Sequence, residues 1–558
     1  MFPSPRNARP LASRSNGDIF NPLSEAVPGL CDLTSGARTA TRGEQKMTFS
    51  QAFRLYPKAI FWSILLSSTI IMDGYDMSLL TSFFTLPVFQ RSYGSTAGNE
   101  QGQYYISSVW QAALINGTQA GVILGLLGNG VVADRFGYQR TLIYALLVLG
   151  AFVFLAVFAR NLETLLAAQI LCGIPWGIFQ TLSVSYAAEV MPVALRGQFL
   201  SYINLCWVLG QTCGVGVIRA LVDTDSEWAY RLPFALQWAF IAVILTGVVF
   251  APESPWWFIR QDRPDDARKS LLRLTSKGAG ALGIEEIVAM MKHTNEVEKY
   301  YGKNNGKMTY LSCFRGVDRR RTEITTMVWV TQQVCGSTLT FYAIPFYAQA
   351  GFQVRNSFNL AVGMYAVSIC ANVVCWFLLQ WVGRRRLFLT GTSLSLAILI
   401  TCGCVSLMPE SAAQSWTLGS LIIVLTAVYQ ATLGPVGYML VAEIPSTRLR
   451  VKTVVVGRVV YNITSIITNT LAARMLSPSA WNWKGKSCFF FVGTTALCLV
   501  WCYFRLPEPY GLSYLEIDIL FAKHAKASKF RVFQRNLERS GYNEIASCDR
   551  GAGAWQRY

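Results

Sequence analysis

Two aspartates, Asp73 and Asp76, lie well inside a long apolar stretch, residues 59–84. The stretch is long enough to cross a bilayer as a helix, because a transmembrane helix needs about 20 residues. A spacing of three residues places the two carboxyl groups on nearly the same helix face. A carboxylate at membrane depth costs about 2.5 kcal/mol or more, so it normally faces a water-filled cavity or a partner. We therefore predict that this face lines a pathway for a solute and that the pair of acids carries a proton.

The composition of the chain is that of a membrane protein with many spans. Of its 558 residues, 52% are hydrophobic and only 14% are charged, whereas about 25% of a soluble domain is charged. The formal net charge of +18 would suit either nucleic acid or a membrane surface. Lys and Arg gather in the tails and in alternate loops between apolar blocks. We therefore expect a lipid bilayer as partner and no nucleic acid.

The apolar blocks predict an all-α membrane protein with twelve transmembrane helices in two six-helix halves. The predicted spans are 59–84, 104–133, 141–159, 161–188, 197–221, 233–251, 325–350, 359–381, 387–408, 417–442, 453–476 and 487–506. A charged loop between the sixth and seventh spans is expected to hold helices at 264–275 and 284–301. The predicted divisions are a largely disordered tail at 1–56, a first half at 57–251, the loop at 252–324, a second half at 325–506 and a second tail at 507–558.

Basic residues in the short loops predict the orientation of the spans. The loops after the second, fourth, eighth and tenth spans carry more Lys and Arg than the alternate loops. Cytoplasmic loops are enriched in these residues. Both termini and the loop 252–324 are therefore expected in the cytoplasm.

Cysteine and histidine usage gives no indication of a metal site. Most of the 14 cysteines lie inside apolar blocks, their spacing does not match a zinc site, and only two histidines are present. Thiols in such blocks are expected to pack as small apolar side chains. The sequence also lacks an evident phosphate-binding loop and an evident nucleophile with its base. We expect no metal, no cofactor and no enzymatic activity.

The two halves of the chain repeat each other. YAAEVMPVALRG at 186–197 corresponds to LVAEIPSTRLR at 440–450, and GVVADRFGYQR at 130–140 corresponds to LLQWVGRRR at 378–386. Each copy follows the equivalent span of its own half. Such a parallel repeat is typical of secondary transporters, in which the substrate site lies between the repeats.

Several motifs in order along the chain resemble the sugar-porter family of the major facilitator superfamily. They are GYD at 74–76, the segment 130–140, PESPWWFIR at 252–260, QQVCGSTLTFYAIPFY at 332–347 and PEPYGLSYLEID at 507–518. The resemblance covers about residues 50–535. Within that family, CGIPWGIFQTLSVSYAAE at 172–189 resembles the fungal maltose and α-glucoside permeases, which are proton symporters.

The resemblance implies a function. We expect a monomer in the fungal plasma membrane that takes up a sugar, an α-glucoside such as maltose, by proton symport. Two departures from the family pattern keep a proton-independent uniporter open as an alternative. Val122 stands where the maltose permeases have a third acid, and Gln169 stands where related symporters have an arginine. A sugar sensor that does not transport is the other alternative.

The resemblance also implies roles for particular residues. Arg458 is expected to pair with Asp73 and Asp76 in proton coupling, although from its position alone it could instead extend to the lipid headgroups. A sugar site needs amides, hydroxyls and flat aromatic surface. The expected sugar-binding residues are Gln332, Gln333, Asn204, Gln211, Thr338, Tyr438 and Asn462.

Charged residues at the cytoplasmic helix ends are expected to form a conformational latch between the halves. Salt bridges there would favour one state of the transporter and break in the other. The expected latch residues are Asp134, Arg135, Arg140, Glu189, Arg196, Glu253, Arg260, Arg384, Glu443 and Arg450.

Overall fold

The computed structural model describes residues 49–96, 104–276, 283–304, 309–409, 411–446, 449–477 and 480–510, and a few residues between 517 and 530. This part of the chain is almost entirely helical. Its two strands, β1 (Ser95–Thr96) and β2 (Tyr104–Tyr105), pair in an antiparallel hairpin. Residues 1–48 and 531–558, where most of the two tails was expected, lie outside the described residues.

The first half of the bundle is followed by a loop that contains helices of its own. Its helices are α4 (Pro57–Ser67), α5 (Thr69–Phe83), α6 (Pro87–Tyr93), α7 (Ser108–Phe136), α8 (Tyr138–Val157), α9 (Leu162–Val190), α10 (Val193–Leu221) and α11 (Trp228–Phe250). The intervening loop holds α12 (Pro255–Arg260), α13 (Pro264–Leu274), α14 (Ile284–Asn304) and η2 (Tyr310–Phe314). The two loop helices predicted from sequence are thus confirmed as α13 and α14.

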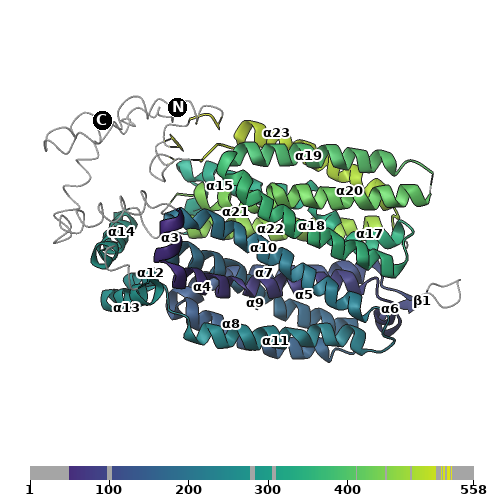
Figure 1. The fold of residues 1–558 in the computed structure, drawn as a ribbon, viewed down its shortest axis with the longest axis horizontal. Helices are drawn as coiled ribbons and strands as arrows, with labels where there is room; N and C mark the ends of the chain where they lie inside the picture. The colour runs from purple at the N-terminus through teal and green to yellow at the C-terminus, as the bar shows by residue number, and fades with distance from the viewer. Residues whose placement is uncertain are drawn as a thin grey trace, which may run out of the picture.

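The second half repeats this arrangement. Its helices are α15 (Gly316–Gln332), η3 (Gln333–Ser337), α16 (Thr338–Phe341), α17 (Ala343–Gln349), α18 (Val354–Trp381), α19 (Arg384–Val405), α20 (Ala412–Ala431), α21 (Leu433–Glu443), α22 (Arg450–Leu476), η4 (Lys484–Lys486) and α23 (Ser487–Arg505). In Figure 1 the two halves lie side by side, with α12–α14 at one end of the bundle and β1 at the opposite end. We call these the α12 end and the β1 end.

The number of spans agrees with the sequence. Ten helical segments of the described residues are long and apolar enough to cross a membrane, with α20 and α21 taken as one. The first and seventh predicted spans are absent from that set because each is interrupted. The first breaks at Ser68 between α4 and α5, and the seventh is divided among α15, η3, α16 and α17. Together these segments account for the predicted spans.

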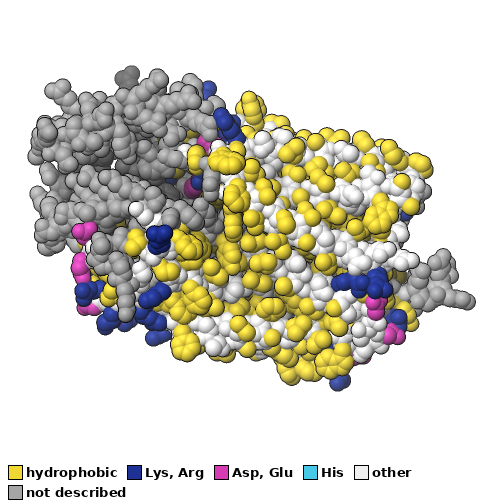
Figure 2. Space-filling model, in the orientation of Figure 1, with side chains coloured by type: hydrophobic (Ala, Val, Ile, Leu, Met, Phe, Trp, Pro, Cys, Tyr) yellow, Lys and Arg dark blue, Asp and Glu magenta, His cyan; other side chains and the backbone are white. Residues whose placement is uncertain are grey.

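The side of the bundle is covered by apolar side chains. Figure 2 shows hydrophobic side chains over the faces of the long helices, and Lys and Arg gathered toward the two ends. Leu124, Leu147, Val243 and Leu497 are among the large apolar residues that are exposed there. An apolar belt between charged ends is the surface that a bilayer requires.

The close packing of α7 against α9 depends on glycine. A Cβ atom added at Gly121 would lie 2.1 Å from the carbonyl oxygen of Ile170, and one at Gly177 would lie 2.2 Å from that of Val122. Small residues let helix backbones approach closely in membranes. Val122, the position of the missing third acid, is fully buried beside this crossing.

The boundary of the first tail differs from the expectation. Residues 1–56 were expected to be a largely disordered tail, but α3 (Phe49–Leu55) is helical and packs against α4 and α10. Ala52 of α3 is fully buried against Ile60, Met191 and Leu195. Burial of these apolar side chains accounts for the helix forming so early in the chain.

Candidate functional site

Three adjoining hollows lie between the two halves of the bundle, and Trp207 and Arg458 border all of them. The acidic hollow is lined by Asp76, Gln119, Gln180, Gln333, Tyr461, Asn462, Ser465 and Asn469, among others. The amide hollow is lined by Asn204, Gln211, Trp329, Gln332, Ser337, Thr340, Tyr429, Gln430 and Tyr438, among others. The apolar hollow lies beside Ile70, Val184, Ile203, Val441 and Val454.

Asp73 is linked to Arg458 through a glutamine. Gln180 Nε2 donates to Asp73 Oδ2 at 2.8 Å, and Arg458 Nε donates to Gln180 Oε1 at 3.0 Å. Asp73 is fully buried and Arg458 is only 6% exposed. The bridge joins α5 and α9 of the first half to α22 of the second. Arg458 therefore does not extend to the headgroups, and it meets Asp73 through Gln180 rather than in a direct ion pair.

Aromatic rings surround the guanidinium of Arg458. Its Cζ lies 4.5 Å from the ring centre of Tyr461, 4.7 Å from that of Trp329 and 5.8 Å from that of Trp207. Cation–π contacts of this kind stabilise a desolvated cation by about 2 kcal/mol. The rings thus help to stabilise the positive charge of Arg458 at the centre of the bundle. The side chain of Arg458 lies there between the hollows.

Asp76 has a different partner. Gln237 Nε2 of α11 donates to Asp76 Oδ1 at 2.7 Å, and among the described residues Asp76 Oδ2 has no hydrogen-bond partner. Asp76 is 2% exposed and lines the acidic hollow, whereas Asp73 lies behind Gln180. Of the two acids, Asp76 therefore has the direct route to the cavity.

The predicted glutamine pair divides between two hollows. Gln332 lines the amide hollow and donates to the carbonyl oxygens of Leu433 and Gly434 at 2.7 and 2.9 Å. Gln333 lines the acidic hollow and donates to Ser465 Oγ at 3.0 Å. Consecutive residues of a helix point about 100° apart, so the two neighbouring glutamines line different hollows.

Most of the other predicted sugar ligands also line a hollow. Asn204 Nδ2 donates to Gln430 Oε1 at 2.7 Å across the two halves, and Gln211 and Tyr438 line the same amide hollow. Asn462 lines the acidic hollow and donates to the carbonyl oxygen of Arg458 at 2.9 Å.

Thr338 is the exception. It is fully buried, borders none of the three hollows, and bonds the carbonyl oxygen of Gln333 at 3.3 Å. The reason is the kink in η3, where Gly336 has a φ of 89°. The turn brings Ser337 and Thr340 to the amide hollow instead. Thr338 was expected from the family pattern, and in this arrangement its hydroxyl does not reach a hollow.

Residue Gln169, the other departure from the family pattern, is a packing residue. It is fully buried and accepts a hydrogen bond from Thr118 Oγ1 at 3.0 Å. It does not line any of the three hollows. Together with the burial of Val122, this leaves Asp73, Asp76 and Arg458 as the carboxyl and guanidinium groups of the described central site.

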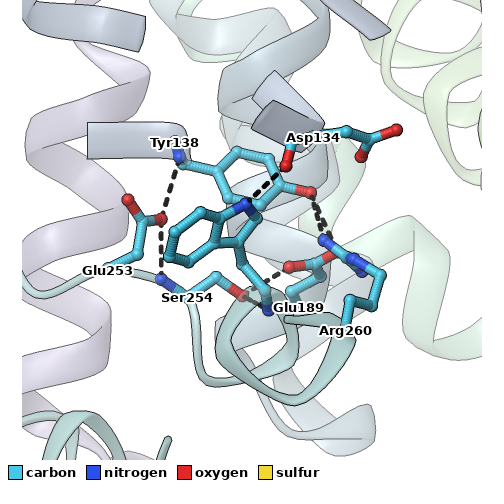
Figure 3. A network of polar contacts seen from close by, with 7 residues as sticks. Asp134, Tyr138, Glu189, Glu253, Ser254 and Arg260 are labelled. Atoms are coloured by element: carbon cyan, nitrogen blue, oxygen red, sulfur yellow. Dashed lines mark hydrogen bonds and ion pairs between the residues drawn. The ribbon is translucent and has the colours of Figure 1, made fainter. Parts of the chain in front are cut away.

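Three of the expected latch residues, Glu189, Glu253 and Arg260, belong to one network at the α12 end (Figure 3). Glu189 accepts from Arg260 Nη1 and from Tyr138 Oη, each at 2.8 Å, and it also bonds Ser254 Oγ. Glu253 accepts from the backbone N–H groups of Tyr138, Gln139 and Ser254 at 2.9–3.0 Å. Burial raises the pKa of Glu253 even though these donors oppose the shift.

The network fixes the turn between α7 and α8. Gly137 there has a φ of 87°, and a Cβ atom would lie 2.4 Å from Glu253 Oε2. Trp257 Nε1 donates to the carbonyl oxygen of Asp134 at 3.0 Å. The loop helix α12 is thereby attached to the ends of α7, α8 and α9.

The remaining latch residues include one ion pair within the second half. Arg384 and Glu443 pair at 3.6 Å within the second half. The side chains of Arg135 and Arg140 are exposed, Arg450 begins α22, and the side chain of Arg196 lies outside the described residues. The ion pairs Arg260–Glu189 and Arg384–Glu443 thus lie within one half or join it to α12, whereas Asp134 interacts electrostatically with Lys452 of α22 across the halves. The latch between the halves stays a prediction.

Besides the Gln180–Arg458 bridge, hydrogen bonds between neutral side chains cross between the halves. Asn116 Nδ2 donates to Thr470 Oγ1 at 2.7 Å toward the β1 end. Trp376 Nε1 donates to Ser201 Oγ at 2.8 Å toward the α12 end. The three hollows lie between these two hydrogen bonds, so the halves are in contact on both sides of the site.

Comparison with known proteins agrees with this architecture. Residues 62–521 match the family model described as sugar (and other) transporter. The chain belongs to this family. An α-glucosides permease of Saccharomyces cerevisiae is 38% identical over 91% of this chain and 84% of its own length. A maltose permease of the same yeast is 38% identical over 92% of this chain and 84% of its own.

Solved structures show the same fold. The proton:xylose symporter XylE bound to 6-bromo-6-deoxy-D-glucose superimposes with a TM-score of 0.69 at 18% identity, over 83% of this chain and 99% of that one. The inward-open XylE from E. coli gives a TM-score of 0.64. The protein is thus a multi-pass membrane transporter of the sugar family rather than an enzyme.

Four residues that the sequence analysis did not select are central to the site: Gln180, Gln237, Trp207 and Trp329. Each is a large polar or aromatic side chain inside an apolar helix. The buried amides of Gln180 and Gln237 could have been suspected, because a polar group in hydrocarbon needs a partner. Which carboxyl group each of these amides bonds, Asp73 or Asp76, depends on how the helices pack against one another.

Proposed function

We propose that the protein carries an α-glucoside such as maltose into the cell together with a proton. In this proposal the protein works as a monomer in the fungal plasma membrane, with both termini in the cytoplasm. The named functions of the two yeast relatives support the substrate class. The buried acids support the proton. The excess of basic residues in the loops at the α12 end supports the orientation.

The observation that carries the proposal is the bridge from Asp73 through Gln180 to Arg458. It is a hydrogen-bonded path from an acid of one half to a cation of the other, inside the cavity wall. An ionised Asp73 accepts from Gln180, whose carbonyl oxygen then faces the guanidinium. A proton on Asp73 weakens that acceptor and so weakens the contact between the halves.

Asp76 supplies the entry point for the proton. Its free Oδ2 belongs to the acidic hollow, while Gln237 fixes Oδ1. Proton and sugar each shift the balance between outward-facing and inward-facing states by binding one of them more tightly. The transport of sugar and proton is coupled when the halves can change their contacts only with both the sugar and the proton bound.

The test is sugar uptake by cells that lack other sugar permeases. We expect labelled maltose to accumulate and the unbuffered medium to become alkaline when the sugar is added. Uptake without alkalinisation, and insensitive to an uncoupler, would instead identify a uniporter. Absence of uptake of any mono- or disaccharide from a panel, with the protein present at the cell surface, would contradict transport and favour a sensor.

A further inference from the structure

Three acceptor oxygens and one hydroxyl, Tyr342 Oη, belong to residues that line the acidic hollow and lack hydrogen-bond partners among the described residues. Asp76 Oδ2, Gln119 Oε1 and Gln333 Oε1 belong to lining residues that are each at most 3% exposed. None of these oxygens has a hydrogen-bond partner among the described residues. A buried acceptor without a donor costs about 1–3 kcal/mol. Three in one hollow therefore indicate a ligand that brings its own donors.

The amide donors next to these oxygens are already engaged. Gln333 Nε2 donates to Ser465 and Thr468, and Asn469 Nδ2 donates to Ser465 Oγ. Gln119 Nε2 lies 3.9 Å from the sulfur of Met77. The hollow is thus suited to a ligand rich in hydroxyl groups, since an anion would bring only acceptors. A cation is disfavoured because Arg458 lines the same hollow.

The amide hollow has the opposite character. Its amides bond to one another or to backbone, as Asn204 does with Gln430 and Gln332 does with Leu433. Its walls include the rings of Trp329, Tyr429 and Tyr438, and Trp329 and Tyr438 meet edge to face with centroids 4.9 Å apart. Aromatic walls give apolar contact area to the face of a sugar ring.

The two hollows adjoin. Trp207, Phe341, Arg458 and Tyr461 line both of them. A ligand made of two rings joined by one flexible link could place one ring on each side of this shared wall. The cavity volumes of about 40 and 50 Å³ are smaller than a sugar ring needs, so both hollows must widen as the halves separate before a sugar enters.

We propose that the acidic hollow is a second glycosyl subsite, which binds one ring of a disaccharide through hydroxyl donors to Asp76, Gln119 and Gln333. The other ring occupies the amide hollow. The inference rests on the proposed function and goes further, because it assigns the preference for disaccharides to one group of residues. Gln119 of α7 is its specificity-determining residue.

The experiment compares binding of maltose and of methyl α-D-glucoside to the purified full-length protein, measured by quenching of tryptophan fluorescence. The variant Gln119→Met keeps the length of the side chain and removes its amide. Gln111→Met is the matched control, because Gln111 lies on the same helix and bonds the carbonyl oxygen of Ile106. Asn469→Leu is a second variant of the hollow in case Gln119→Met does not fold.

We expect Gln119→Met to weaken maltose binding about fivefold or more, the effect of one lost hydrogen bond, and to change methyl glucoside binding less than about twofold. Gln111→Met should change neither. Equal weakening of both sugars, or no change in either, would overturn the subsite. An altered pH dependence of uptake with unchanged selectivity between the two sugars would also overturn it, because Gln119 would then act on the proton of Asp76 and not on the sugar. If the unmodified protein bound neither sugar, the proposed function itself would fail.

Discussion

At the scale of single residues, the centre of the protein is a small set of buried polar groups in hydrocarbon. Asp73, Asp76 and Arg458 are each at most 6% exposed. A buried charge persists only when hydrogen bonds or opposite charges compensate the lost water. Gln180 and Gln237 provide that compensation, and their amides hold the two carboxyl groups in different surroundings.

Replacing Asp76 by Asn should remove proton coupling while leaving the shape of the hollow almost unchanged. We expect cells with this variant to lose accumulation of maltose above the external concentration. Downhill exchange of labelled sugar should remain. Uptake and exchange assays would measure the two activities. Asp225→Asn, at an exposed acid paired with Arg91, is the control, and full accumulation by a double Asp73→Asn, Asp76→Asn variant would disprove the coupling role.

Replacing Gln180 by Leu should affect both stability and transport. The change leaves Asp73 Oδ2 and Arg458 Nε without the partners that they have here. A lost buried partner costs about 1–3 kcal/mol, so the thermal midpoint in detergent should fall. Uptake should fall more than for Gln414→Leu, whose amide bonds only backbone carbonyls at the surface. Equal uptake in the two variants would contradict a role for the bridge.

At the scale of elements, the interruption of the seventh span places the polar groups of the site. Cys335 and Gly336 leave helical geometry, with Gly336 at a φ of 89°. The kink separates α15, which carries Gln332, from α16, which carries Thr340. It explains why the expected hydroxyl of Thr338 faces the backbone and not the cavity.

Replacing Gly336 by Ala should destabilise the protein. Left-handed geometry costs a residue with a Cβ atom about 1–2 kcal/mol. In addition, the new atom would lie 3.2–3.3 Å from Leu399 and Leu425. We expect a lower thermal midpoint and reduced maltose uptake. Gly493→Ala is the matched control, since that helical glycine has open space around its Cβ position, and the change there should be neutral or slightly stabilising.

At the scale of the whole molecule, the two halves meet through neutral hydrogen bonds toward each end and through hydrogen bonds from Arg458 and Arg219 to amide oxygens, while the ion pairs Glu189–Arg260 and Arg384–Glu443 stay within one half or tie it to α12. Neutral contacts are easier to exchange than buried ion pairs, because breaking them strands no charge. The network of Glu189 and Arg260 then acts as a rigid brace that lets the first half move as one body.

A cross-link between the halves should stop transport. The side chains of Asn116 and Thr470 meet at 2.7 Å across the halves toward the β1 end. In the double variant Asn116→Cys, Thr470→Cys, oxidation should abolish maltose uptake and a reductant should restore it. The unmodified protein treated with the same oxidant controls for its own cysteines. Unchanged uptake by a fully cross-linked sample would show that this contact persists through the cycle.

The sequence by itself determined the all-helical membrane fold, the order of the apolar helices and the two helices predicted in the loop at 252–324. Hydropathy and loop charge are local properties, so they can be read along the chain. It also identified the two acids, because a carboxyl group inside an apolar stretch is conspicuous in any context. The family motifs added Arg458 and the glutamine pair.

Tertiary structure alone decided which groups meet. Gln180 and Arg458 are 278 positions apart, and no local pattern connects them. The side of a helix that faces the cavity depends on crossings such as that of α7 and α9 and on the kink at Gly336, which is why Thr338 lies outside the hollows and Val122 is packed away. The physical reason is that the pattern of apolar residues along a helix determines which of its residues are buried. Which side chains of different helices contact one another depends on how those helices are rotated against each other.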